Sequence, residues 1–303
     1  MQWGQIKTLF ILCFLLLDIY LLFLVIQKIG NEDFGPANDS GQLEDLDQLE
    51  LENIKISIDL PDPLPDEVYL TIREKTFTKE EVEEIIARDN QDIEVINNSF
   101  IISMLKEKIA IPENATEEVI EQIIFSTVYL GSEYTFDYWD KERNILVFFQ
   151  EKNDRPVYYH SSGIIFVYLN DDNEIDAYTQ TVLGEVEPSS DKKSLISPLK
   201  AIMRLYQSNL LLPNDEVTDI KIGYYSMFPP VVVPTWKITI DGKQNRYVNA
   251  IERFVIPVND GFMDDMIQKG IESTRSITKN EELHDQMIEI LMAKLMSNRS
   301  ESE

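Results

Sequence analysis

The chain has 303 residues, a formal net charge of −27 and 44% hydrophobic residues. That apolar fraction is ordinary for a globular protein, so much of the chain is expected to bury a core. The excess of negative charge argues against binding nucleic acid or anionic lipid headgroups through the soluble part, because both require a basic patch. Proteins are therefore the expected partners.

The first predicted element is a membrane-spanning helix. The segment Thr8–Ile26 has no Gly, Pro, Lys, Arg or Glu, and 15 of its 19 residues are Leu, Ile, Phe or Val. At about 1.5 Å rise per residue, it is long enough to cross the hydrocarbon core of a bilayer. No small-residue cleavage site follows, which disfavours a signal peptide. We predict a single-pass protein of the cell membrane with a cytoplasmic stub at residues 1–7, a transmembrane helix at 8–27 and an extracytoplasmic domain.

One ionisable residue, Asp18, lies near the middle of this span. A carboxyl group at mid-membrane is costly and is normally retained where it meets a partner. The span offers no small-xxx-small surface, so a hydrogen bond from Asp18 is its expected specific contact with another helix. We predict that Asp18, Phe14, Leu15, Leu21 and Leu22 bind a transmembrane partner. The alternative is that Asp18 is tolerated through protonation and local water.

The segment 28–66 is rich in Asp, Glu and Pro and is predicted to be an acidic, extended linker, with a short edge strand at 54–58. An extracytoplasmic domain follows at 67–256. A capping box at Thr78–Glu81 predicts a helix to Arg88, and a strand pair is expected around Asn97-Asn98. A second helix, Thr116–Tyr129, is predicted to be capped by Thr116 and closed by Gly131.

Runs dense in aromatic and β-branched residues predict an antiparallel meander after the second helix. The pattern then starts again with a helix at Pro198–Gln207, three further strands and a hairpin turn at Asp241-Gly242. The predicted fold class is α+β, with antiparallel sheet covered by helices, in up to two helix-plus-meander units that divide near residue 190. Residues 257–303 are predicted to be a polar tail with a helix at Glu281–Met296, which either docks or frays. The predicted strands lie at 134–139, 144–151, 164–170, 174–183, 217–226, 236–240 and 245–251.

Few residues in the chain offer catalytic chemistry. The two histidines are His160 and His284, and the single cysteine, Cys13, lies within the membrane span, so zinc sites and a Cys nucleophile are excluded. His160-Ser161-Ser162 is interpreted as a turn, and so is the acidic cluster 170–176, because it lacks the spacing of a calcium loop. No nucleotide-binding or α/β-hydrolase pattern occurs. The sequence therefore predicts no enzyme activity, no cofactor and no metal.

A group of aromatic residues in the second half of the chain has two interpretations. Tyr224, Tyr225 and Trp236, together with Phe228 and neighbouring prolines, could form an extracytoplasmic recognition surface. Equally, these residues suit the core of a sheet, which is the commoner environment of strand aromatics.

Several motifs, in order along the chain, resemble the YycI members of the YycH/YycI family from low-GC Gram-positive bacteria. The resemblance implies an accessory of the WalK (YycG) sensor histidine kinase, whose membrane helix associates with the helices of the kinase and of the YycH protein. It also implies a role in signalling on cell-wall metabolism, without catalytic residues. The resembling segments are 3–18, 163–170, 175–183, 223–226, 234–238 and 247–252.

Three hypotheses follow for function. The leading hypothesis is a non-enzymatic regulator of a two-component system that acts through transmembrane helix contacts. The second is an exported protein-binding module, such as a protease inhibitor, whose helix is only a tether. The third is a cell-wall hydrolase, for which no pair of carboxylates is singled out by the sequence.

Overall fold

The structure is a computed structural model and describes residues 7, 10–22, 39–62 and 64–297. The chain forms two compact units, Met1–Glu50 and Leu51–Glu303, and each is described by itself.

In the first unit, residues 10–22 are helical and fall within the predicted membrane span. Residues 8, 9 and 23–27 of that span, and residues 1–6 of the predicted cytoplasmic stub, lie outside the described residues. Within the described ranges, no helix is both long and apolar enough to cross a bilayer.

Helix α2 (Asp39–Leu51) corrects the prediction that residues 28–66 form an extended linker. Leu43, Leu46 and Leu49 recur every three residues, a helical spacing that the surrounding Asp and Glu residues obscured. Residues 28–38 and 63 of the predicted linker lie outside the described residues. The short strand expected at 54–58 is confirmed as β1 (Lys55–Ile56), which pairs in parallel with β11.

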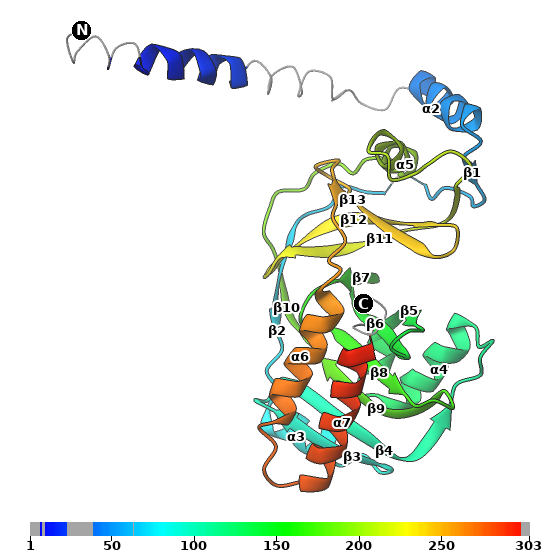
Figure 1. The fold of residues 1–303 in the computed structure, drawn as a ribbon, viewed down its shortest axis with the longest axis vertical. Helices are drawn as coiled ribbons and strands as arrows, with labels where there is room; N and C mark the ends of the chain where they lie inside the picture. Colours follow the sequence, from blue (N-terminus) through cyan, green and yellow to red (C-terminus); the bar gives the residue numbers. More distant parts are fainter. Residues whose placement is uncertain (1–6, 8–9, 23–38, 63, 298–303) are drawn as a thin grey trace. The chain divides into compact units, whose positions relative to one another are not determined.

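The second unit is a mixed α+β domain built on a 14-stranded, mostly antiparallel sheet (Figure 1). Its main strand order is β10-β2-β12-β11-β7-β6-β8-β9-β4-β3. We call β3, β4, β5, β6, β8 and β9 the β8 sheet, and β1, β2 and β10 to β14 the β12 sheet. Strand β7 joins the two, because it pairs antiparallel with β6 and in parallel with β11.

The predicted order of elements is largely confirmed. Helix α5 has the predicted bounds, and β5, β6, β8 and β9 form the predicted antiparallel meander, which β7 interrupts. In chain order the elements after β1 are β2 (Leu70–Glu74), α3 (Lys79–Ile86), β3 (Gln91–Ile96), β4 (Phe100–Ala110), α4 (Glu117–Thr127), the 3₁₀ turn η1 (Gly131–Glu133), β5 (Tyr134–Asp140), β6 (Ile145–Lys152), β7 (Arg155–Tyr158), β8 (Ile164–Leu169), β9 (Glu174–Thr181), β10 (Leu183–Pro188), α5 (Pro198–Gln207), β11 (Glu216–Phe228), β12 (Val231–Ile240), β13 (Gln244–Asn249), β14 (Val255–Ile256), α6 (Phe262–Thr274) and α7 (Glu281–Ser297).

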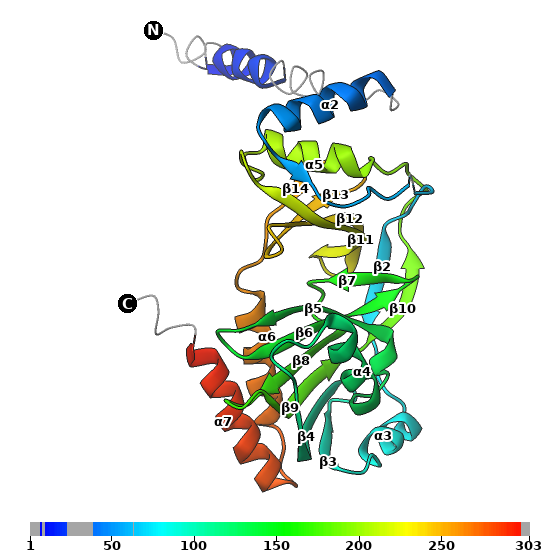
Figure 2. The ribbon, with the colours of Figure 1, turned by 90° about the vertical axis from the view of Figure 1, so that its right-hand side faces the viewer.

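The central strands of the β8 sheet are buried on both faces. In β6, Ile145, Val147 and Phe149 belong to one hydrophobic core, and Leu146 and Phe148 belong to another. Helices α6 and α7 cover the first face, whereas α3 and α4 cover the second (Figure 2). Burial on both faces explains why β6 and β8 have nearly continuous apolar sequences instead of alternating ones.

The polar tail predicted after Pro257 is corrected by helix α6, which the sequence analysis missed. Its buried residues include Met263, Ile267 and Ile271, which recur every four residues but are separated by polar ones. The predicted helix at 281–296 is confirmed as α7, and its Met287 and Leu291 are fully buried in the same core. The hydrophobic core therefore continues beyond residue 256 and is closed by the two C-terminal helices.

Local signals fix the ends of several elements as expected, whereas Thr116, the predicted cap of α4, is at the N-cap position but makes no side-chain capping hydrogen bond. The capping box of α3 is confirmed: Thr78 Oγ1 accepts a hydrogen bond from the Glu81 amide, and Glu81 Oε2 accepts one from the Thr78 amide at 2.8 Å. Both predicted hairpins are present. Asn97 and Asn98 (φ 51° and 54°) connect β3 to β4, and the turn at Asp241-Gly242 connects β12 to β13. Asn, Asp and Gly adopt this left-handed conformation at the least cost.

Helix α4 ends differently from the prediction. Its C-cap residue is Val128, and Leu130 (φ 50°), not Gly131, takes the left-handed conformation. Gly131 is needed for another reason, since a Cβ at this position would lie only 2.6 Å from the carbonyl oxygen of Ile124. The backbone after α4 thus approaches the helix too closely for a side chain.

We predict that Gly131→Ala lowers the free energy of unfolding by about 1–3 kcal/mol, because the added methyl group meets rigid backbone atoms. Gly261→Ala is the matched control, since its Cβ would meet nothing closer than Asn259 Oδ1 at 3.7 Å. The control should change stability by no more than about 0.5 kcal/mol. Denaturant unfolding of both variants measures the difference, and equal effects would contradict the close approach.

Candidate functional site

The predicted contact residues of the N-terminal helix share one side of it. Asp18 lies within the helical segment 10–22, and Phe14, Leu15, Leu21 and Leu22 are three or four positions away from it. Residues at this spacing are neighbours on a helix surface. All five side chains are exposed. We call these five residues the Asp18 stripe: one carboxyl group surrounded by four large apolar side chains.

The three aromatic residues predicted as an extracytoplasmic surface are buried instead. The exposed fractions of Tyr224, Tyr225 and Trp236 are 1%, 3% and 1%. Trp236 Nε1 donates a hydrogen bond to the carbonyl of Ile196 at 3.0 Å, which anchors the segment before α5 to the β12 sheet. These residues are therefore core positions, in agreement with the alternative interpretation. Phe228, at the end of β11, is 75% exposed.

Tyr225 belongs to an aromatic cluster at the junction of the two sheets. The ring of Tyr159, which follows β7, stacks on Tyr225 with centroids 5.0 Å apart and meets Phe262 of α6 edge to face at 5.1 Å. Tyr247 of β13 contacts Tyr158, Tyr159 and Tyr225, with centroids 5.0–5.5 Å apart. Such contacts add about 0.5–1.5 kcal/mol per pair to the burial of the rings.

The cluster keeps its phenol groups neutral. Burial raises the pKa of Tyr225 to about 12. Burial, reinforced by the negative charge of Asp137, also raises the pKa of Tyr159 and of Tyr247 well above the ordinary value of a phenol. These hydroxyl groups therefore carry no charge at physiological pH and do not act as bases.

A buried ion pair lies next to this cluster and connects the two sheets. The carboxylate of Asp137, in β5, pairs with the ammonium group of Lys237, in β12, and the two side chains are only 3% and 9% exposed. Lys237 Nζ also lies 5.5 Å from the centroid of the Tyr158 ring. The pairing of β5 with β6 shifts by one residue at Asp137, and such a β-bulge re-aims a side chain. Asp137 Oδ2 is buried and has no hydrogen-bond partner among the described residues.

The sequence analysis did not single out Asp137 or Lys237. Each is a charged residue in the middle of an otherwise aromatic and apolar strand, Tyr-Thr-Phe-Asp-Tyr-Trp and Trp-Lys-Ile-Thr-Ile. A lone charge in a buried strand requires a partner, so this pattern was the available signal. That the two charges pair with each other is decided by tertiary structure.

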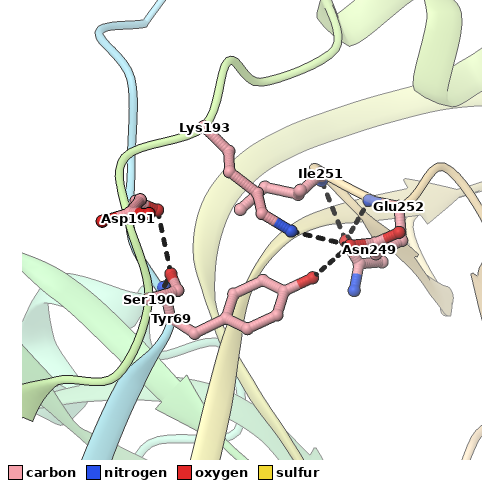
Figure 3. Close-up of polar contacts among 7 residues, drawn as sticks. All are labelled: Tyr69, Ser190, Asp191, Lys193, Asn249, Ile251 and Glu252. Carbon is pink, nitrogen blue, oxygen red and sulfur yellow. Dashed lines mark hydrogen bonds and ion pairs between the residues drawn. The ribbon is translucent and has the colours of Figure 1, made fainter.

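A second polar cluster ties three distant segments together (Figure 3). Glu252 accepts hydrogen bonds from Tyr69 Oη at 2.8 Å and from Lys193 Nζ at 3.2 Å, and these bonds lower its pKa. Burial and the bond to Glu252 raise the pKa of Tyr69 to about 12. Asn249 Oδ1 shapes the turn, because it accepts from the amides of Ile251 and Glu252. Lys193 and Glu252 are about half exposed, so the ion pair adds little stability.

His160 is buried, with 3% exposure, in the turn between β7 and β8. Its Nδ1 accepts a hydrogen bond from the Ser162 amide at 3.1 Å, so the imidazole stabilises the predicted turn. Burial lowers the pKa of His160 below its ordinary value of 6.5.

The acidic segment 170–176 is a hairpin turn between β8 and β9, as predicted. Asn170 Oδ1 accepts hydrogen bonds from the amides of Asp172 and Glu174, at 3.0 and 2.9 Å, and Asn173 has a positive φ of 58°. Across the part of the chain that the structure describes, no group of three or more His, Cys, Asp or Glu residues is placed to hold a metal ion.

Comparison with known proteins identifies the class first. Residues 38–251 match the model of the family described as YycI protein, which covers more than half of the chain. The chain therefore belongs to the YycI family. Members of this family are membrane-associated, non-enzymatic accessory regulators of the WalK (YycG) sensor kinase and are associated with the YycH protein. No curated protein matches the chain.

The solved structures that match the chain are distantly similar to it, and three of them illustrate the similarity. An uncharacterized protein from Eubacterium rectale matches with a TM-score of 0.39 and 10% identity over 68% of this chain and 91% of its own. The C-terminal domain of YpeB from Bacillus megaterium matches with a TM-score of 0.38 and 10% identity, covering 61% and 98%. YycH from Bacillus subtilis matches with a TM-score of 0.36 and 13% identity, covering 61% of this chain and 52% of YycH.

The buried ion pair yields a stability prediction. Lys237→Met should lower the free energy of unfolding by about 3–5 kcal/mol, because it leaves the carboxylate of Asp137 buried and uncompensated. The double variant Lys237→Met/Asp137→Leu should recover most of that loss, since it removes both charges. Denaturant unfolding of wild type, both single variants and the double variant measures the coupling. Additive effects would show that the two side chains do not interact.

His160 yields a prediction about pH. The unfolded chain binds the imidazole proton more readily than the folded chain. Above about pH 6.5 the protonation of His160 therefore takes nothing from the free energy of unfolding, and as the pH falls below this value the free energy of unfolding decreases. One such group contributes at most about 1.4 kcal/mol per pH unit. His160→Asn keeps an acceptor for the Ser162 amide and should reduce the pH dependence of the free energy of unfolding between about pH 7.5 and 5.5, as measured by denaturant unfolding. An unchanged slope would refute this role of His160.

Proposed function

We propose that this protein regulates the WalK (YycG) sensor kinase by contacts of its N-terminal helix with the transmembrane helices of the kinase and of the YycH protein. In this proposal residues 1–7 are cytoplasmic, residues 8–27 span the membrane, and the domain from residue 67 onward is extracytoplasmic. The observation that carries the proposal is the Asp18 stripe on the helical segment 10–22. The YycI family membership supplies the identity of the partners.

The chemistry of the Asp18 stripe suits a contact between helices inside a bilayer. The carboxyl of Asp18 has no water to bind in hydrocarbon, so a donor or acceptor on a neighbouring helix stabilises it. Phe14, Leu15, Leu21 and Leu22 provide the van der Waals surface around that bond, and packing of this kind is the main source of affinity between membrane helices. The stripe thus combines one specific polar contact with an apolar surface on which a neighbouring helix can pack.

Regulation through such a contact requires unequal binding to two kinase states. A helix that binds both states equally changes nothing, however tightly it binds. A hydrogen bond worth on the order of 1 kcal/mol that is made in only one state shifts the kinase equilibrium roughly fivefold. That shift is sufficient for an accessory that tunes signalling and does not switch it completely.

Co-purification of the kinase with the full-length protein in detergent tests the proposal. Asp18→Leu should reduce the kinase recovered roughly fivefold, and exchange of the whole helix for an unrelated one should abolish recovery. The change in kinase output in cells should likewise be larger for the helix exchange than for Asp18→Leu. The exported domain should remain folded in all variants, and its thermal unfolding checks this.

Two matched controls make the result specific. Asp18→Asn retains hydrogen-bonding capacity and should recover the kinase nearly as well as wild type. Leu16→Ala alters a residue on the opposite side of the helix, about 200° from Asp18, and should have little effect. Full recovery after helix exchange would refute the proposal and move the contact to the extracytoplasmic domain, with the helix as a tether.

A further inference from the structure

Strand β3 forms a regular free edge of the sheet. It is the last strand in the sheet order and pairs with β4 on one side and, among the described residues, with no strand on the other. The edge at the opposite end, β10, is irregular, because its pairing with β2 shifts between Leu183 and Val186 and it ends in Pro188, which has no amide hydrogen. Strand β3 has neither feature. Regular edges accept another strand more readily than irregular ones.

The backbone groups of every second residue in β3 point away from the sheet. The Lys106 amide donates to the carbonyl of Asn90 at 3.0 Å, which marks a hydrogen-bonded pair of the antiparallel ladder. Such pairs alternate with pairs that exchange no hydrogen bond. In the observed register the residues at even positions, from Asn90 onward, therefore bond to β4, whereas Ile93 and Val95 turn their amide and carbonyl groups outward. Within the described ranges these outward groups have no hydrogen-bond partner.

The side chains of β3 alternate between an apolar and an acidic face. Ile93 and Val95 are half-buried and pack against the core that α3 and α4 cover. Asp92 and Glu94 point to the other face, and neither is buried. Asp92 lies 3.2 Å from the ammonium group of Lys106, with about half of each side chain exposed, and Glu94 has no ion-pair partner in the described part of the chain. The free edge thus combines unpaired backbone groups with two apolar side chains and two carboxylates.

The strand is held in position by the side chain of its first residue. Gln91 Nε2 donates to the carbonyl of Thr127 at 2.7 Å, and Gln91 Oε1 accepts from the hydroxyls of Ser103 and Tyr178 at 2.8 and 2.9 Å. An edge that is already ordered loses little conformational entropy when a partner binds.

The two carboxylates decide which kind of strand fits the edge. Antiparallel pairing of two copies of β3 about Glu94 would place the two Glu94 carboxylates opposite each other, and pairing about Ile93 would place Asp92 opposite Glu94 of the other copy. Like charges in opposite positions destabilise a sheet, which disfavours a second copy as the occupant. A strand with Lys or Arg at these positions gains opposite-charge pairs instead, and the net charge of −27 attracts a basic partner.

From these observations we propose that β3 is a docking edge for an extended segment of another protein, in which basic residues alternate with apolar ones. The backbone of that segment pairs with Ile93 and Val95, and its apolar side chains lie beside theirs. Its basic side chains lie beside Asp92 and Glu94. Strand addition of this kind obtains affinity from main-chain hydrogen bonds and specificity from alternate side chains. The docking edge is separate from the Asp18 stripe and does not depend on the proposed function.

Fluorescence anisotropy of a labelled peptide, titrated with the full-length protein in an uncharged detergent, tests the docking edge. The peptide is Lys-Val-Lys-Ile-Lys-Val-Lys. The comparisons are a peptide of the same composition with its four lysines first, and an alternating peptide with Glu in place of Lys. Saturable binding of the alternating basic peptide, at least about fivefold tighter than that of both comparisons, is the expected result. Absence of this binding, or equal binding of the two basic peptides through charge alone, overturns the proposal.

Variants locate the binding. Glu94→Lys should weaken it about fivefold or more, because an attraction becomes a repulsion. Glu187→Lys is the matched control, since it makes the same charge change at an exposed position of β10, and its affinity should stay within about twofold of wild type. Equal affinities of these two variants refute the assignment.

A third variant tests the backbone contribution. Ile93→Pro removes an outward amide hydrogen without breaking a bond to β4, an orientation in which edge strands tolerate Pro. It should weaken binding of the alternating basic peptide about fivefold or more, because one main-chain hydrogen bond is lost. Unchanged binding by a folded Ile93→Pro variant would exclude strand addition at β3. Should this variant fail to fold, Glu94→Lys decides alone.

Discussion

The buried ion pair between Asp137 and Lys237 is the contact on which the arrangement of the second unit depends. Strand β7 joins the two sheets through only two residue pairs on each side, so backbone hydrogen bonds alone fix their relation weakly. The ion pair joins a side chain of the β8 sheet to a side chain of the β12 sheet, and the aromatic cluster lies beside it. Loss of either charge would leave the other buried and uncompensated, so the two residues must occur together at this junction.

The second unit and the N-terminal helix differ in their chemical properties. The second unit is covered on both faces of its β8 sheet, and no disulfide stabilises it, since the chain's single cysteine, Cys13, lies in the N-terminal helix. The helix carries the Asp18 stripe, one polar group among four large apolar side chains. A non-enzymatic regulator can shift a kinase between two states only by binding them unequally, as we propose for this stripe.

The sequence by itself determined the elements whose signals are local. The capping box of α3, the first turn of α5, the Asn and Asp-Gly hairpins and the strands of the β8 sheet depend on residues close together in the chain, and they occur where they were predicted. Tertiary structure decided the rest. Helix α6 is stabilised by burial against a distant sheet, Tyr225 and Trp236 are interior because other strands cover them, and Asp137 and Lys237 meet across 100 residues of chain. The local sequence does not specify such contacts, because each is created only when separate segments are brought together.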